Sequence, residues 1–354
     1  MRKIKRYISR TIFGTISIVL MVIVCLDSIS SLVDQLGEMK ANYGFLDVLF
    51  TVFLEIPGSI YDFLPLSCLV GCLVGLGVLA STSELVVIRA AGVSVTQITW
   101  AVMRTALLFI VVSSAIGEFV SPYSNQYVDS YRALAKQEGS RMEVNQGHWN
   151  REGNEFMYFN AVLPNGQLLG ITRHQFNDEG ELVESSRVQS AIYQGNGSWF
   201  EENGAVTSFE GDKTERFTFS TRTWYTEVSP ALLNVLVLNP EDLPMQRLRD
   251  QVDYLERQGL DAGEYQLSFW RKALQPFATA SLVVIAISFI LGPLRQTTMG
   301  FRVFVGVLVG LVFQFSQQLL APASILLGFS PMYAVLAPIV ISFSVGLLLI
   351  RRSQ

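Results

Sequence analysis

The chain has 354 residues, half of them hydrophobic and only 16% charged, and its mean hydropathy is +0.37. A soluble domain carries about 25% charged residues, so a single soluble globule is excluded, and so is a disordered chain, which needs low hydrophobicity and high charge. The apolar residues gather toward both ends, whereas residues 121–268 carry a net charge of −10. This acidic centre argues against nucleic acid as a partner.

Six stretches of the sequence are long and apolar enough to cross a membrane. Each is close to the roughly twenty residues that span about 30 Å of hydrocarbon. They are predicted at residues 11–33, 58–80, 98–120, 272–291, 301–321 and 331–350. Three spans therefore precede the polar segment, and three follow it.

The distribution of Lys and Arg predicts how these spans are oriented. One face of the membrane receives eleven basic residues, from the N-terminal arm, the loops at 81–97 and 292–300, the C-terminus and the adjoining span ends, whereas the opposite short loops hold only Lys40. Because cytoplasmic loops are enriched in Lys and Arg, both termini are predicted to be cytoplasmic. The predicted domains are residues 1–120 (three spans), 121–268 (an external domain) and 269–354 (three spans).

The external domain changes from a helical to an alternating period. Runs at residues 155–160, 167–172 and 216–222 are rich in aromatic and β-branched residues, and turn sequences separate the runs at 164–166, 177–180, 195–197, 203–204 and 211–213. This pattern predicts an antiparallel sandwich or barrel. A helix is expected to follow, with Asn239 as N-cap, Pro240 at its first position and Gly259 as its stop.

The loop after the second span predicts a short helix outside the bilayer, near residues 82–92. Ser81 and Glu84 have the spacing of a capping box, and Gly92 lies where a helix would end. The apolar side chains predicted to be exposed on it are Leu85, Val86 and Ile88. Two explanations are open: the helix docks into a cytoplasmic motor, or it rests on lipid and Glu84 only caps it.

The sequence lacks the motifs of common catalytic sites. It has no GxxxxGK[ST] phosphate loop, no HExxH and no GxSxG, and its two histidines, His148 and His174, both lie in the β region. The chain is therefore predicted not to be an enzyme, with no cofactor or metal of its own.

Four sequence elements resemble the LptF/LptG permease family, which belongs to the lipopolysaccharide transport ABC exporter of Gram-negative bacteria. They are Lys-Arg-Tyr-Ile at 5–8, Val-Asp-Gln-Leu at 33–36, Ser-Glu-Leu-Val-Val-Ile-Arg-Ala-Ala-Gly at 83–92 and Phe-Ile-Leu-Gly-Pro-Leu-Arg at 289–295. The resemblance implies an α-helical inner-membrane protein with six transmembrane helices and a periplasmic β-jellyroll between the third and fourth.

The same resemblance implies the partners and the residues that meet them. An LptF-like permease would form a heterodimer with this chain, an LptB-like ATPase dimer would bind the ATP, and LptC-like and LptA-like periplasmic proteins would receive lipopolysaccharide. The residues that would face the ATPase are Glu84, Leu85, Val86, Ile88 and Arg89.

Lipopolysaccharide presents phosphates and acyl chains, so its site needs cations near the outer membrane boundary, above an apolar cavity. By position, the candidates are Lys40, Arg271 and Lys272, and Arg132 matches a family position that contacts substrate. Simple snorkelling of Arg271 and Lys272 is the alternative. Acidic residues within or at the ends of spans are costly enough to suggest function, namely Asp27, Asp34, Asp62 and Glu118; Asp34 is included in the substrate site.

Two questions stay open at the level of sequence. Gly71, Gly75, Gly77, Gly306 and Gly310 have the spacing of close helix packing, either within the chain or against a partner. The chain could also be a membrane-anchored module that binds periplasmic partners without transport, or a membrane enzyme that acts on lipid head groups.

Overall fold

The computed structural model describes residues 2–37, 39, 43–137, 148–162, 167–210, 213–226, 228, 239–257, 261–292 and 297–353. The chain forms two compact units. We call Met1–Asp34, Val52–Ser124 and Leu243–Gln354 the helical unit, and Gln35–Thr51 with Asn125–Asp242 the β unit. The helix that the sequence places at the end of the external domain is thus grouped with the membrane helices.

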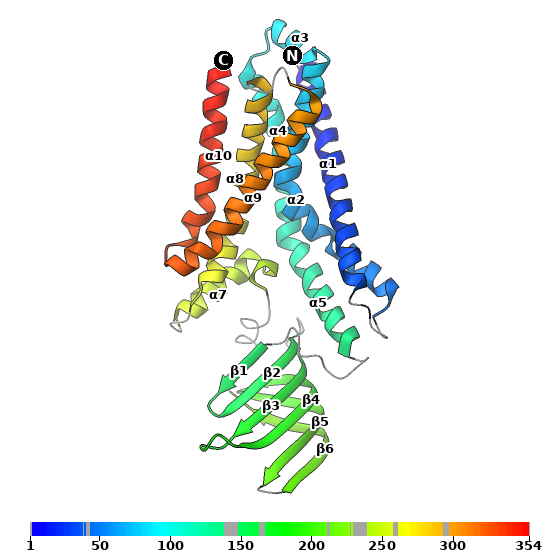
Figure 1. Ribbon diagram of the computed structural model, residues 1–354, viewed down its shortest axis with the longest axis vertical. Helices are drawn as coiled ribbons and strands as arrows, with labels where there is room; N and C mark the ends of the chain where they lie inside the picture. Colours follow the sequence, from blue (N-terminus) through cyan, green and yellow to red (C-terminus); the bar gives the residue numbers. More distant parts are fainter. Residues whose placement is uncertain are drawn as a thin grey trace. The chain divides into compact units, whose positions relative to one another are not determined.

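The six predicted membrane spans are confirmed as six long apolar helices within the described residues. They are α1 (Arg2–Leu36), α2 (Phe45–Ser81), α4 (Val95–Phe119), α8 (Gly263–Leu291), α9 (Met299–Leu327) and α10 (Pro331–Ser353) (Figure 1). The second begins thirteen residues earlier than predicted and continues through Pro57 and Pro65. Most of its apolar stretch is buried, and this packing overrides the local cost of the two prolines.

Glycines bring three helices of the helical unit close together. A Cβ atom added to Gly71 of α2 would lie 2.7 Å from the Cα atom of Ile16 in α1, and one added to Gly310 of α9 would lie 2.4 Å from Leu66 of α2. At the cytoplasmic end predicted for α9, Arg302 donates to the Gly77 carbonyl of α2 at 2.9 Å. These glycines therefore serve packing within the chain, which answers one question left open by the sequence.

We expect Gly71→Ala to destabilise the helical unit by about 1–3 kcal/mol, because the new methyl group would displace the backbone of α1. Gly14→Ala in α1 is the matched control, since a Cβ atom there meets nothing within 4 Å. Thermal unfolding of both variants in detergent measures the difference. An equal melting temperature for the two would contradict the close approach of α1 and α2.

The helices of the helical unit differ in how far the rest of the chain covers them. In the most apolar stretches of α2 and α8, 67% of the residues are buried, but in those of α1 and α9 only 11% are buried. Large apolar side chains on the uncovered faces include Met21, Leu26, Phe315 and Leu319. Helices α1 and α9 therefore present most of their apolar surface outward from this chain.

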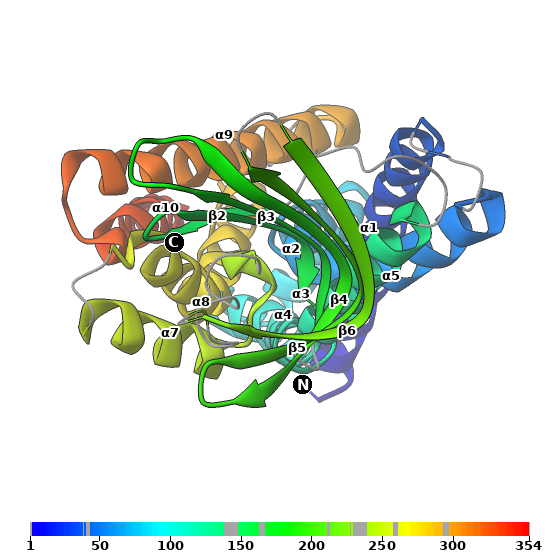
Figure 2. The same ribbon diagram turned by 90° about the horizontal axis from the view of Figure 1, so that it is seen from below.

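The β unit holds one six-stranded antiparallel sheet in the described residues. Its strands are β1 (His148–Glu152), β2 (Glu155–Val162), β3 (Leu168–Phe176), β4 (Leu182–Gly195), β5 (Ser198–Glu210) and β6 (Lys213–Tyr225). Neighbours in sequence are neighbours in the sheet, which is strongly curved (Figure 2). The predicted antiparallel strands are confirmed, but the described strands form a meander within one curved sheet, whereas the sequence predicted a sandwich or barrel and the family resemblance implied a jellyroll.

Most of the predicted turns that fall on described residues join strands. Gly180, with φ +83°, lies between β3 and β4, and Asn196 and Gly197, with φ +51° and +71°, join β4 to β5 as a tight hairpin. The turn predicted at 203–204 is wrong: β5 continues through it, and Asn203 takes φ +53° while the ladder to β4 and β6 persists on both sides. The turn at 164–166 and residues 211 and 212 lie outside the described residues.

The helix predicted to begin at Asn239 begins later. Pro240–Asp242 forms a single 3-10 turn, and α7 runs from Met245 to Arg257; Gly259 lies outside the described residues. The side chain of Glu118, at the end of α4, accepts hydrogen bonds from the Met245 amide at 2.9 and 3.1 Å. A carboxylate in another helix thus replaces the local cap, which sequence spacing alone does not reveal.

Candidate functional site

The first candidate site is the short helix α3 (Glu84–Ala90) between α2 and α4. Figure 1 shows α3 at the same end of the helical unit as the N- and C-termini. The helix ends as predicted, because Gly92 follows it with φ +87°, a conformation that glycine adopts readily. The predicted short helix between the second and third spans is therefore present.

The apolar side chains of α3 face in two directions. Leu85 and Ile88 were expected to be exposed, but they are only 6% and 8% exposed and belong to the main core of the helical unit. They lie three residues apart and share the inner face of the helix. Val86 and Val87 are 49% and 66% exposed and form the outer face, and Arg89 is half-buried.

The predicted capping box is wrong. Ser81 is the last residue of α2, where its hydroxyl donates to the Val78 carbonyl. Ser83 precedes α3 in the left-handed conformation, with φ +61°, and makes no side-chain cap. The side chain of Glu84 instead interacts with that of Tyr7 in α1, so Glu84 links α3 to the first helix.

A cavity of about 400 Å³ lies between the start of α1 and α3. The residues that line it are Lys3, Ile4, Tyr7, Thr82, Glu84, Val87 and Ile88. The sequence did not assign Tyr7 to this site, although Tyr7 lies within the 5–8 motif that carried the family resemblance. A protein that contacts the outer face of α3 would therefore also meet the first turns of α1.

The predicted substrate cations are distributed over both units. Arg271 and Lys272 are half-buried in α8, and the Lys272 ammonium donates to the Leu243 carbonyl at 2.6 Å, which ties α8 to the segment before α7. Arg132 is half-buried in α5 (Ser121–Gln137) of the β unit. Asp34 is exposed near the end of α1, and Lys40 lies outside the described residues.

Arg132 lies next to an aromatic cluster that joins α5 to the start of α2. Its neighbour Tyr131 donates a hydrogen bond to the carboxylate of Asp47, and the rings of Tyr127 and Tyr131 both contact Phe50. These contacts fix the orientation of α5 near its C-terminal end, and with it the position from which the Arg132 side chain extends.

Two of the membrane acids have structural partners. Asp27 of α1 accepts a hydrogen bond from Ser59 of α2 at 2.6 Å, and Glu118 caps α7. Hydrogen bonding offsets the cost of a polar group in hydrocarbon. Helix packing thus accounts for both residues.

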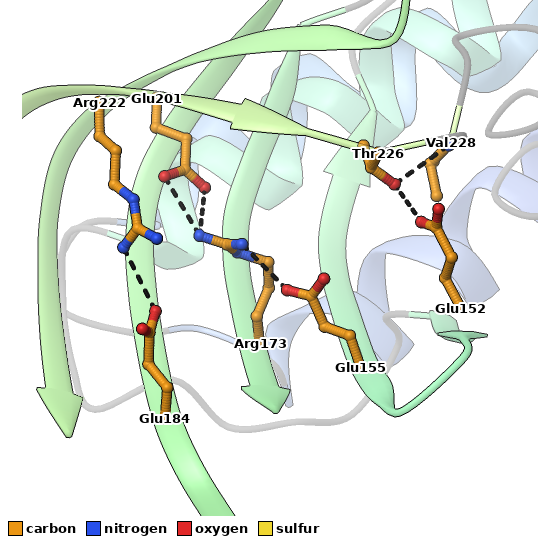
Figure 3. Close-up of polar contacts among 8 residues, drawn as sticks. All are labelled: Glu152, Glu155, Arg173, Glu184, Glu201, Arg222, Thr226 and Val228. Atoms are coloured by element: carbon orange, nitrogen blue, oxygen red, sulfur yellow. Dashed lines mark hydrogen bonds and ion pairs between the residues drawn. The ribbon is translucent and has the colours of Figure 1, made fainter. Parts of the chain in front are cut away.

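The β unit contains a buried ionic cluster that the sequence did not predict. Arg173 of β3 pairs with Glu155 of β2 and with Glu201 of β5, both at 2.9 Å (Figure 3). Its guanidinium also lies 4.7 Å from the ring centre of Trp224. We call these four residues the Arg173 cluster. The side chain of Glu201 is fully buried, and that of Arg173 is 6% exposed. Alternation along the strands marks inward positions, but it does not pair residues that are 28 positions apart.

The Arg173 cluster predicts a pH dependence. Burial raises the pKa of Glu201, although the Arg173 guanidinium favours its charged form. A carboxyl group whose pKa is higher in the folded state contributes stability that is full below the unfolded pKa and is lost as the pH rises through the folded pKa. We therefore expect Glu201→Gln to flatten the fall in unfolding free energy that occurs as the pH rises above the ordinary Glu pKa of about 4.3.

Denaturant unfolding of the full chain measures this effect, because the fluorescence of Trp199 and Trp224 reports on the surroundings of Glu201. The control is Glu215→Gln, because it removes an exposed carboxylate of β6 that lies outside the Arg173 cluster. Identical slopes for wild type and Glu201→Gln would rule out the raised pKa.

Together, these features define a class of protein. The chain is a multi-pass membrane protein with six apolar helices, a short helix at the end where both termini lie, two helices with uncovered apolar faces and a β domain between its third and fourth spans. This is the architecture expected of a permease subunit that works with other chains.

Comparison with known proteins identifies the family. Residues 6–352 match the family described as lipopolysaccharide export system permease LptF/LptG. The chain is 36% identical to the lipopolysaccharide export system permease protein LptG of Escherichia coli strain K12, over 99% of this chain and 98% of that protein. It is 31% identical to the LptG of Haemophilus influenzae, over 94% of each. The chain therefore belongs to the LptF/LptG permease family, which confirms the resemblance seen in its sequence.

Proposed function

We propose that this chain is the LptG-type permease subunit of an exporter that moves lipopolysaccharide out of the bacterial inner membrane. The full-length match to proteins named LptG carries this proposal. The matched relatives bear the LptG name, which favours this subunit over the paralogous LptF type. In this proposal the termini and α3 are cytoplasmic, and the β unit is periplasmic.

The uncovered faces of α1 and α9 support a second permease subunit. In a complete transporter, an LptF-like chain would cover these faces and close a chamber for the acyl chains. The exposed amides of Gln314 and Gln318 lie on the uncovered side of α9, where a partner subunit or a polar head group could satisfy them.

The outer face of α3 supports docking of an LptB-like ATPase. Val86 and Val87 are exposed there, and Leu85 and Ile88 anchor the helix in the core, so force on the outer face would pass into the bundle. The contact between Tyr7 and Glu84 adds a direct connection to α1. The chain itself would be non-catalytic, with ATP bound by the partner and lipopolysaccharide passed to LptC-like and LptA-like proteins.

Photocrosslinking in the membrane tests this function. A photoreactive residue at Leu319, exposed on α9, is expected to capture lipopolysaccharide or a second permease chain, whereas the same residue at Leu348, exposed on α10, is expected to capture neither. Equal capture at both positions would favour a membrane-anchored module without a transport chamber.

The candidate cations supply a further prediction. We expect the charge reversal Arg271→Glu to lower lipopolysaccharide capture at Leu319 by about tenfold, because a phosphate contact to a cation is worth about 1.5–3 kcal/mol. Arg352→Glu, at the opposite end of the helical unit, is the control. Unchanged capture in Arg271→Glu would remove Arg271 from the substrate site and leave snorkelling as its role.

A further inference from the structure

A second cavity, which no predicted site includes, lies on the face of the sheet opposite its core. Its volume is about 310 Å³, and side chains of all six strands line it. The core of the sheet is formed by Met157, Phe159, Ile171 and Val188. Alternate residues of the same strands point away from that core and line the cavity, which we call the Arg187 pocket.

Two rows of cross-strand pairs build the Arg187 pocket. In the first row, Tyr158 pairs with Trp149 and with Thr172, and Thr172 pairs with Arg187. In the second row, Ser185 pairs with His174 and with Thr207, and Thr207 pairs with Arg216. Side chains on neighbouring strands in register lie close enough to act together, so the ladder holds both rows side by side.

The charge of the pocket is opposite to that of its surroundings. Residues 148–226 contain six basic and eleven acidic residues, a net charge of −5. Among the described residues that line the pocket, Arg187 and Arg216 are basic and none is acidic. Both arginines are exposed, and the ion pairs of the described sheet use Arg173 and Arg222 instead. A cationic pocket within an acidic domain favours an anionic ligand.

One wall of the pocket is aromatic. The ring of Trp149 stacks on that of His174 with centroids 6.1 Å apart, and it lies 5.3 Å from that of Tyr158. Trp149 is 54% exposed, whereas Tyr158 beneath it is 4% exposed. An aromatic surface that is supported from below and open above can receive a flat apolar face, such as one side of a sugar ring.

The opposite part of the pocket is lined by the hydroxyl groups of Thr172, Ser185 and Thr207. Hydroxyls both donate and accept, which suits the hydroxyls of a sugar and the oxygens of a phosphate. A volume of about 310 Å³ accommodates a small polar ligand but is at the low end for binding pockets. Guanidinium groups, hydroxyls and an aromatic wall thus indicate a sugar phosphate rather than an acyl chain.

We infer that the Arg187 pocket binds a phosphorylated sugar, with the phosphate at Arg187 and Arg216 and the ring against Trp149. This inference rests on the proposed function in one respect: the phosphorylated sugars of lipopolysaccharide would pass the β unit during export. A free sugar phosphate has the same chemistry, so the test separates the two sources.

The test compares two doubly substituted full-length chains that lose the same charge. Arg187→Gln with Arg216→Gln alters the pocket, whereas Arg151→Gln with Lys213→Gln removes two exposed charges of the same sheet outside it. Calorimetric titration with glucosamine 1-phosphate is expected to show binding that the first pair weakens at least about tenfold and the second leaves unchanged. Glucosamine without phosphate is expected to bind more weakly to wild type.

A photoreactive residue at Ala205, which lines the pocket, identifies the source in the assembled complex. Capture of lipopolysaccharide, lost when its phosphates are removed enzymatically, supports the lipid as the source. If glucosamine 1-phosphate binds in the titration but no lipopolysaccharide is captured at Ala205, a free sugar phosphate is supported as the ligand. No binding of glucosamine 1-phosphate to wild type, equal weakening in both double variants, or capture of a periplasmic protein at Ala205 would each overturn the inference.

Measuring the release of lipopolysaccharide from vesicles by the same complex distinguishes failure of the proposed export function from failure of the Arg187 pocket as a binding site. If the wild-type complex releases lipopolysaccharide but does not bind glucosamine 1-phosphate, only the Arg187 pocket is refuted. If it binds the sugar phosphate but releases no lipopolysaccharide, the proposed export function fails, and the pocket stands as a site for a free sugar phosphate.

Discussion

Replacing Val87 with aspartate is expected to release the ATPase from the purified complex while the helical unit stays folded. Val87 is 66% exposed on the outer face of α3, so the isolated chain tolerates a charge there. In the complex, the same position would be buried against the ATPase, and loss of a buried valine contact costs about 1.5–3 kcal/mol before the cost of burying a charge is added. We expect the affinity to fall by about 100-fold or more, measured by copurification and by ATPase activity per complex.

Two further substitutions make this result specific. Val87→Thr keeps nearly the same shape and is expected to retain the ATPase. Leu85→Asp places a charge in the core and is expected to unfold the region around α3, so it does not report on docking. Full copurification of the ATPase with a folded Val87→Asp variant would exclude the outer face of α3 as the docking surface.

Replacing Arg173 with methionine is expected to destabilise the β unit by about 3–5 kcal/mol. The substitution removes the guanidinium that pairs with Glu155 and Glu201 and leaves the fully buried carboxylate of Glu201 without its counter-charge. Removing one partner of a buried ion pair is costly for this reason. Denaturant unfolding of the full chain, monitored by tryptophan fluorescence, measures the loss.

A neighbouring pair provides the control. Arg222→Met breaks the contact between Arg222 and Glu184, whose side chains are 36% and 26% exposed, respectively. This substitution is expected to lower the unfolding free energy by less than about 1 kcal/mol. Adding Glu201→Leu to Arg173→Met is expected to restore most of the stability, because a packed apolar side chain replaces the uncompensated charge. A cost for Arg173→Met no greater than that for Arg222→Met would show that the Arg173 cluster does not stabilise the sheet.

The sequence predicted the number of spans and the period of the β domain, because both depend on local properties. A span needs only enough consecutive apolar residues, and a strand needs only alternation with turn residues at its ends. Gly92 as the end of α3 and the hairpin at Asn196 and Gly197 follow from backbone conformations that few residues adopt. The family resemblance was equally local, since it rested on four short motifs.

The site was predicted only in part, because exposure and capping depend on which surfaces the folded chain covers. The apolar character of Leu85, Val86, Val87 and Ile88 was evident, but their division into an inner and an outer face was not. In the structure, Glu84 interacts with Tyr7, which is 77 positions away in the sequence, and not with the serine three residues before it. Asn203 lies inside a strand because ladders on both sides hold β5 in place.

By itself, the sequence determined a membrane protein with six spans, an antiparallel β domain between the third and fourth spans, a short helix between spans and membership of a permease family. Hydropathy, the periodicity of apolar residues and short motifs are local properties of the sequence, so they can be recognised without the folded structure. The tertiary structure alone decided that the glycines pack α1 and α9 against α2, that Arg173 is buried between two carboxylates, and that Arg187 and Arg216 share a pocket with Trp149. Each of these features joins residues that are distant in sequence, and only helix packing and strand register bring such residues together.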